Sequence, residues 1–90
     1  MEIEFDPAKD ALNIAKHGLS LARAVELQMA DFFEDRRIAY GEVRYIGFGL
    51  LDGLPHSLAF TRPRPDTIRA ISLRRAHLRE YRRYVVDQGD

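Results

Sequence analysis

The sequence predicts an α+β domain in which a mostly antiparallel sheet packs against helices. Three observations support this class. Residues 1–5 alternate apolar and acidic side chains, residues 7–31 show helical spacing, and residues 37–73 return to the period of strands before a last helix. Short turns join the later strands, which favours antiparallel pairing. We expect the order β-α-α-β-β-β-β-α within a single domain over residues 1–90.

The first helix is predicted to follow the N-terminal strand directly. Asp6 suits the N-cap, and Pro7 suits the first helical position, where its missing N–H costs nothing. Gly18 is expected to end this helix in the left-handed conformation. Four residues at helical spacing form an apolar stripe that should face the core, namely Ala8, Ala11, Leu12 and Ala15.

A second helix is predicted over about residues 21–31, with Ser20 as its N-cap. The link to the first helix is very short, so the two helices should pack as a pair. The expected inner face carries Leu21, Ala24, Val25, Gln28 and Phe32.

Four strands and a final helix are expected after residue 37. The strands cover about 38–40, 42–51, 56–62 and 67–73, and Asp52-Gly53 is a strong hairpin-turn signal. The helix covers about 75–87, with Leu78, Tyr81 and Val85 as its core stripe.

Two of these strands place arginine on a face with apolar residues. Alternation groups Arg44 with Ile46, Phe48 and Leu50, and it groups Arg69 with Thr67, Ile71 and Leu73. Gly47 and Gly49 lie inside a strand, where glycine indicates a close backbone approach.

The formal net charge of zero is a cancellation between two oppositely charged parts of the chain. Residues 1–35 hold eight acids and three bases, a balance of −5, and residues 36–90 hold eleven bases and six acids, a balance of +5. All eleven bases of the second part are arginine. Arginine binds phosphate through two hydrogen bonds and stays charged, so this distribution favours a local phosphate-binding surface.

Composition excludes several other classes of function. There is no cysteine, so disulfide scaffolds and thiolate metal sites are excluded, and the three histidines are too scattered to form a metal site. No phosphate-binding glycine loop and no nucleophile elbow occurs. The acidic N-terminus is unlike a signal peptide, and no apolar segment is long enough to span a bilayer. We therefore expect a cytoplasmic protein with no cofactor and no membrane partner.

Three clusters of residues are candidates for chemistry, and each also has a purely structural interpretation. The first is the polar face of the first helix, Lys9, Asn13, Lys16 and His17, which also suits a solvated helix end. The second is Arg44, Arg62 and Arg69, which could form cross-strand ion pairs. The third is a basic ridge on the last helix, Arg75, Arg79 and Arg82, which could be simply solvated.

The order and spacing of several short motifs resemble the BrnT family of type II toxins, which have a RelE-like ribonuclease fold. The motifs are Phe5-Asp6-Pro7-Ala8-Lys9, Asn13, Lys16-His17-Gly18, Ala24, Asp31, Glu42-x-Arg44, Gly49, the segment from Arg69 to Ala76, and Glu80 with Tyr84. The chain differs from many members in having Phe5 and Leu73 where tryptophan and alanine are common.

The resemblance implies an endoribonuclease that inhibits translation and needs no metal. It also implies a BrnA-type antitoxin as partner, RNA as substrate, and indirect contact with promoter DNA through the antitoxin complex. In the mechanism that we hypothesise, the ribose 2′-hydroxyl attacks the adjacent phosphorus, arginine stabilises the developing charge, and His17 or Lys16 transfers protons. The expected catalytic residues are His17, Lys16, Arg44, Arg69, Arg74 and Tyr84. The expected RNA-binding residues are Lys9, Arg62, Arg64, Arg75, Arg79 and Arg82.

The same arginines also suit a non-catalytic role. In this alternative the chain binds an antitoxin or nucleic acid and acts as a co-repressor in a DNA-binding complex. RNA binding without strand scission would favour it.

Overall fold

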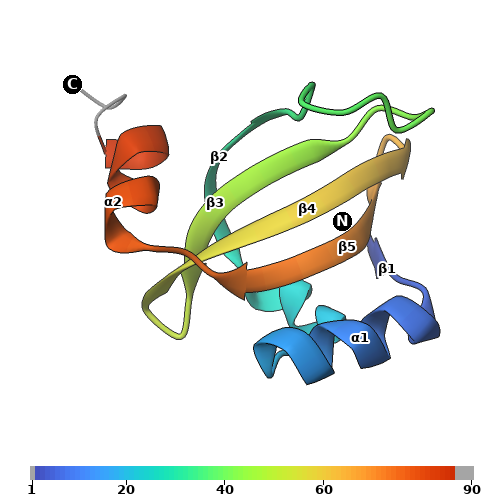
Figure 1. Cartoon of the computed structure of the whole chain (residues 1–90), viewed down its shortest axis with the longest axis horizontal. Helices are drawn as coiled ribbons and strands as arrows, with labels where there is room; N and C mark the ends of the chain where they lie inside the picture. The colour runs from blue at the N-terminus through green and yellow to red at the C-terminus, as the bar shows by residue number, and fades with distance from the viewer. Residues whose placement is uncertain (1, 87–90) are drawn as a thin grey trace.

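The computed structural model describes residues 2–86, which form a five-stranded sheet with helices packed against it (Figure 1). The strands are β1 (Glu2–Glu4), β2 (Gln28–Glu34), β3 (Tyr45–Leu51), β4 (Leu54–Arg64) and β5 (Thr67–Arg75). They lie in the order β1-β5-β4-β3-β2, and every pair is antiparallel except β1 with β5. The α+β class and the mostly antiparallel sheet are therefore confirmed.

The helical segments are short after the first. They are α1 (Pro7–His17), a 3₁₀ helix η1 (Leu21–Glu26), α2 (Leu78–Tyr81) and a π-helical turn η2 (Arg82–Val86) that continues α2. None of these segments within residues 2–86 has the length and apolar character needed to cross a bilayer.

The predicted ends of α1 are confirmed, but its predicted orientation is wrong. Asp6 caps the helix by accepting the Ala8 N–H at 2.8 Å, and Gly18 ends it with a φ of 73°. The apolar stripe faces solvent, however, and Leu12 is 69% exposed. The side of α1 that meets the sheet instead presents the buried polar residue Asn13, whose hydrogen bonds replace apolar packing.

The second predicted helix is much shorter than expected. Ser20 does cap it, and Leu21 and Ala24 are buried, but the helix ends at Glu26 and Val25 is 67% exposed. The chain then becomes extended as β2, which pairs with β3 from Gln28 onward. Pairing with the next strand, β3, thus overrides the local helical spacing, and Phe32 comes to lie 45% exposed on this edge strand.

The predicted strand at 38–40 is absent, and the next strand begins at Tyr45 rather than at residue 42. Residues 35–44 form a loop between β2 and β3, closed by a hydrogen bond of 2.7 Å from the Asp35 N–H to the Arg44 carbonyl. This loop is the long connection between β2 and β3 in Figure 1.

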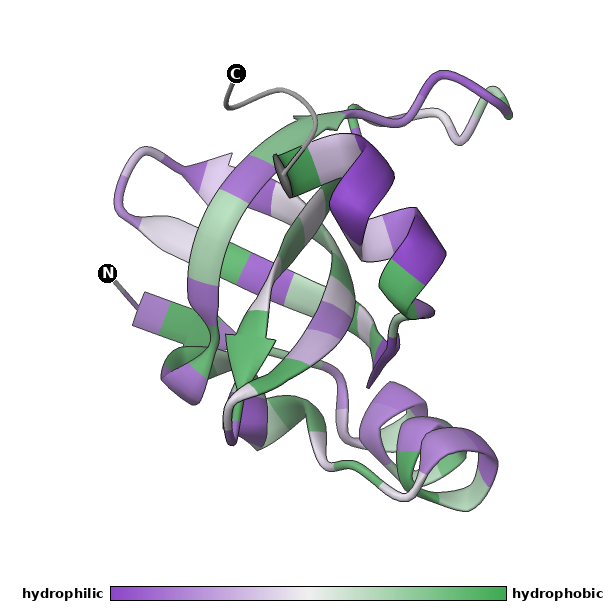
Figure 2. Ribbon diagram, turned by 90° about the vertical axis from the view of Figure 1, so that its left-hand side faces the viewer, coloured by the Kyte–Doolittle hydropathy of each residue, from purple (hydrophilic) through white to green (hydrophobic). Residues whose placement is uncertain are grey.

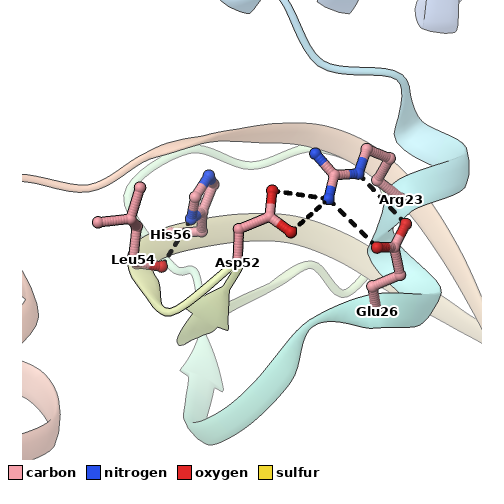
Figure 3. Close-up of polar contacts among 5 residues, drawn as sticks. All are labelled: Arg23, Glu26, Asp52, Leu54 and His56. Carbon is pink, nitrogen blue, oxygen red and sulfur yellow. Dashed lines mark hydrogen bonds and ion pairs between the residues drawn. The ribbon is translucent and has the colours of Figure 1, made fainter.

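The hairpin between β3 and β4 has the expected turn at Asp52-Gly53. Both residues have positive φ, 54° and 73°, as a type I′ turn requires. Arg23 of η1 donates to both carboxylate oxygens of Asp52 at 2.8 Å and also pairs with Glu26 (Figure 3). This contact ties η1 to the hairpin turn.

The close backbone approach predicted at the strand glycines is confirmed. A Cβ on Gly49 would overlap the backbone of Gln28 in β2, and one on Gly47 would lie 2.8 Å from the Met29 side chain. Alanine is therefore excluded at Gly49 unless the two strands separate.

The core lies on the side of the sheet that η1 covers. Bands of hydrophobic and hydrophilic residues alternate along the strands in Figure 2, as expected for a sheet with one buried face. The buried cluster consists of Leu21, Ala24, Leu51, Leu58, Phe60, Ile68, Ala70 and Leu73.

A β-bulge at Ile71 changes which side chains of β5 share a face. In the pairing with β4, Ala70 lies opposite Phe60 and Ser72 lies opposite Ala59, so Ile71 faces no residue of β4. Leu73 is therefore in the core, and the prediction that Arg69 and Leu73 share one face of the strand is wrong. The bulge brings Arg69 and Arg74 to one face although they are five residues apart. Their partners in β4 are Thr61 and Ser57, which are four apart.

The last predicted helix starts later than expected, because β5 continues to Arg75. Leu78, expected in the core, is 53% exposed, whereas Tyr81 and Val85 are partly buried. Arg75 lies on a strand, Arg79 on α2 and Arg82 on a π-helical turn, so they do not form the predicted helical ridge. Residue 87, the last of the predicted helix, lies outside the described residues.

Candidate functional site

The sheet face opposite the core carries three adjoining hollows. One of ≈ 510 Å³ is lined by the bases Lys9, Arg44 and Arg69 and by the acids Glu4, Asp6 and Glu42. A second, of ≈ 240 Å³, is lined by Arg44, Ser72 and Arg74 among others. The third, of ≈ 160 Å³, lies beside α1 and is lined by Lys9, Lys16, His17 and Ser72. Ile71, the bulge residue, lines all three. We call this surface the cationic face, defined by Lys9, Lys16, His17, Arg44, Arg69 and Arg74.

Arg44 lies where the two larger hollows meet. Its guanidinium carbon is 4.1 Å from the centroid of the Tyr40 ring, a cation–π contact that orients the group. Its Nε is buried and has no hydrogen-bond partner among the described residues. A buried, unpaired N–H of a charged group carries a desolvation cost.

The other arginines around Arg44 are already paired with carboxylates. Arg69 donates to Glu4 at 2.9 Å and 3.1 Å, and Arg74 forms two bonds of 3.0 Å with Glu80. Arg74 holds the pKa of Glu80 below its usual value, although burial of that carboxyl acts in the opposite direction. Carboxylates thus hold Arg69 and Arg74 in place, whereas the Nε of Arg44 stays unpaired within residues 2–86.

A hydrogen-bonded network in the loop at 35–44 supports Arg44. Asp35 is buried and accepts from the Arg37 side chain at 2.9 Å and 3.0 Å, and from the Tyr40 hydroxyl at 2.9 Å. The hydrogen bond from Arg37 is the largest influence holding the pKa of Asp35 well below its usual range. The network places the Tyr40 ring beneath Arg44.

The sequence analysis did not predict this network, nor that Ser57 and Ser72 line the hollow of ≈ 240 Å³. The only local signal is the short spacing within Asp35-Arg36-Arg37, which is common on solvated surfaces. The network depends on how the loop closes, which is not readable from spacing.

His17 and Lys16 lie together at the C-terminal end of α1, beside β5. His17 is partly buried, and this burial is the main cause that lowers its pKa, followed by the charges of Lys16 and Arg74. Its imidazole is therefore mostly neutral at pH 7, with a nitrogen able to accept a proton. Lys16 and His17 of α1 line one hollow together with Ile71 and Ser72 of β5, so the helix and strand contributions to the cationic face adjoin each other.

Tyr84, also expected to be catalytic, lines none of the three hollows of the cationic face. Its ring stacks on Phe48 at 5.1 Å and on Phe33 at 5.0 Å, which fastens η2 to the sheet. It lines a separate hollow of ≈ 540 Å³ with His77, Arg79, Glu80 and Arg83. Glu80, through its ion pair with Arg74, connects this hollow to the cationic face.

The residues expected to bind RNA are dispersed. Lys9 belongs to the cationic face, and Arg64 adjoins it by sharing Glu4 with Arg69. Arg62 instead borders an apolar groove on the core side of the sheet and donates to the Pro65 carbonyl at 3.0 Å. The exposed Arg75, Arg79 and Arg82 lie at or beyond the end of β5.

The other two histidines are outside the cationic face. His56 is buried on β4 and its Nδ1 lies 2.8 Å from the Leu54 carbonyl (Figure 3), whereas His77 is exposed before α2. Among residues 2–86, no three histidine or acidic side chains are grouped in a way that could hold a metal ion.

Comparison with known proteins identifies relatives of this chain. The family model described as "Ribonuclease toxin, BrnT, of type II toxin-antitoxin system" matches residues 5–80. The crystal structure of the Brucella abortus ribonuclease toxin BrnT superposes with a TM-score of 0.69 at 28% identity, covering 86% of this chain and 97% of the Brucella chain. No curated protein sequence matches this chain significantly.

Proposed function

Because the chain belongs to the BrnT family of ribonuclease toxins of type II toxin–antitoxin systems, we propose that it is a metal-independent endoribonuclease that cleaves RNA on the cationic face. The observation that carries this assignment is Arg44, an oriented guanidinium with a buried, unpaired Nε at the junction of two hollows. The Arg44 guanidinium, which lines both hollows, would bind a phosphodiester oxygen there. The cationic side chains of this face attract the RNA backbone.

The proposed reaction is an attack by the ribose 2′-hydroxyl on the adjacent phosphorus. Neutral His17 accepts the hydroxyl proton, and the 5′-oxygen leaves with a proton from Lys16. Arg44, with Arg69 and Arg74 beside it, stabilises the additional negative charge on the phosphoryl oxygens. The products are a 2′,3′-cyclic phosphate and a 5′-hydroxyl.

The same face accounts for control by an antitoxin. We propose that a BrnA-type antitoxin in the cytoplasm covers the cationic face with acidic side chains and brings the complex to promoter DNA. Inhibition then follows from occupation of Arg44, and translation is blocked only when the antitoxin is removed.

The test is cleavage of RNA by the purified protein in EDTA, with analysis of the product ends. Cyclic-phosphate and 5′-hydroxyl ends are expected, and His17→Ala should reduce the rate at least about tenfold. His77→Ala is the matched control, because His77 is exposed and has no side-chain cap bond. Salt-dependent RNA binding without any scission would overturn the proposal and favour a non-catalytic co-repressor.

A further inference from the structure

Asn13 is a buried polar residue on a helix whose other side chains are mostly exposed. It is 5% exposed, and its amide makes three hydrogen bonds. The amide NH₂ donates to the carbonyls of Leu19 at 2.8 Å and Leu73 at 2.9 Å, and the Oδ1 accepts the Leu73 N–H at 3.1 Å. Two of these bonds join segments that are 60 residues apart in the sequence.

The position of Leu73 explains why an amide is needed. β1 pairs with β5 only as far as Glu4 opposite Arg69, so within the described residues the same edge of β5 has no strand beside it at Leu73. The backbone N–H and carbonyl there would lack partners, although Leu73 itself is fully buried. The Asn13 side chain bonds to both groups of one residue, as a neighbouring strand would.

This contact also determines where the end of α1 lies. Asn13 and His17 are four residues apart and share a side of the helix. Leu73 stands between Ser72 and Arg74, which both line the cationic face. The hydrogen bonds between Asn13 and Leu73 therefore place His17 beside β5, the strand that carries Arg74.

We propose that Asn13 is a positioning residue for RNA cleavage, because its amide latches α1 to the open edge of β5 and so holds His17 beside Ser72, where both line one hollow of the cationic face. This inference rests on the proposed function for its catalytic consequence, but the latch itself is independent of it. The lowered pKa of His17 agrees with this geometry, since its largest cause, burial, and the charge of Arg74 on β5 both require α1 to be docked, whereas Lys16 is its neighbour on the same helix.

The experiment compares Asn13→Ala with Asp10→Ala, a control on the same helix. Asp10 accepts from the Ser20 hydroxyl at 2.9 Å and the Leu21 N–H at 2.7 Å, so its removal weakens the contact with η1 but not with β5. The readouts are the His17 pKa, followed by NMR titration of its ring protons, and kcat and KM for RNA cleavage at a temperature where both variants are folded.

Asn13→Ala should raise the His17 pKa towards 6.5 and lower kcat at least about tenfold, with KM changed less than about threefold. Asp10→Ala should leave the His17 pKa and kcat near their wild-type values while lowering stability. A His17 pKa that is the same in Asn13→Ala and wild type would overturn the latch. If the wild-type chain fails to cleave RNA, the proposed function is refuted, but the titration still decides whether the latch positions His17.

A second measurement keeps the inference testable if Asn13→Ala does not fold. In the wild-type protein the Leu73 amide proton should exchange with solvent as slowly as amide protons inside the sheet, because the amide N–H donates a hydrogen bond to the Asn13 Oδ1. Exchange as rapid as that of an exposed loop amide would show that the latch is open in solution and would overturn the proposal.

Discussion

Replacing Arg44 with methionine should separate activity from stability. Methionine keeps an unbranched apolar stem but removes the guanidinium. In the free protein the substitution removes the cation–π interaction with Tyr40, about 0.5–1 kcal/mol for a partly exposed pair. It also removes a buried N–H without a partner, whose cost is about 1–3 kcal/mol. These two effects oppose each other, so stability should change little or increase slightly.

Activity should respond very differently. A hydrogen bond from a charged group contributes about 1.5–3 kcal/mol, which corresponds to a decrease of roughly 10- to 150-fold in kcat/KM. The dependence of RNA affinity on salt should also weaken, by about 0.7 in the logarithmic slope for each phosphate that Arg44 no longer neutralises.

The assays are cleavage of a fluorescent RNA and unfolding in urea, with Arg36→Met as the matched control. Arg36 lies in the same loop, but its side chain is 81% exposed and pairs with Glu34. The control should cleave RNA at nearly the wild-type rate. Undiminished cleavage by Arg44→Met, or a decrease in activity matched by an equal decrease in folded protein, would refute the reasoning.

Three further predictions concern pH and packing. Since the pKa of His17 is lowered below 6.5, kcat/KM should decrease on acidification only at pH values below 6.5. A decrease that already begins above pH 7 would exclude His17 as the base. Gly49→Ala should lower the free energy of unfolding, measured in urea, by about 1–3 kcal/mol, because its methyl group meets the Gln28 backbone. Gly47→Ala should lower it less, because its methyl group meets only the flexible Met29 side chain. Equal losses in the two variants would contradict the close backbone approach at Gly49. The ionised Asp35 stabilises the fold above its ordinary pKa of 3.8, and this stabilisation disappears as the pH falls towards its lowered pKa in the folded protein. The free energies of unfolding of Asp35→Asn and wild type should therefore differ at pH 6 and converge in acid. A difference that stays constant with pH would exclude the ion pair with Arg37 as the cause.

Much of the local structure could be predicted because it depends on near neighbours in the sequence. Both ends of α1 follow from Asp6 and Gly18, and the β3–β4 turn follows from Asp52-Gly53. The close approach at Gly49 was predictable for a related reason, since glycine inside a strand leaves space for a neighbouring backbone.

The candidate site was predictable in its residue types but not in its grouping. The arginines after residue 36, with His17 and Lys16, indicate phosphate chemistry through their side-chain types alone. Tyr84 and Arg62, expected in the same site, lie respectively in an aromatic stack and beside an apolar groove on the opposite side of the sheet. Whether a charged side chain reaches a site depends on which strand faces it, and spacing does not contain that information.

By itself, the sequence determined the α+β class, the first helix with its caps, the hairpin turn, and the set of cationic side chains. Only the tertiary structure decided that residues 28–34 pair as a strand, that α1 docks through Asn13 instead of its apolar stripe, and that a bulge at Ile71 places Arg69 and Arg74 on one face. The physical reason is that each of these outcomes depends on satisfying backbone groups of the sheet. The partners of those groups lie ten or more residues away in the sequence, beyond the range over which local spacing carries a signal.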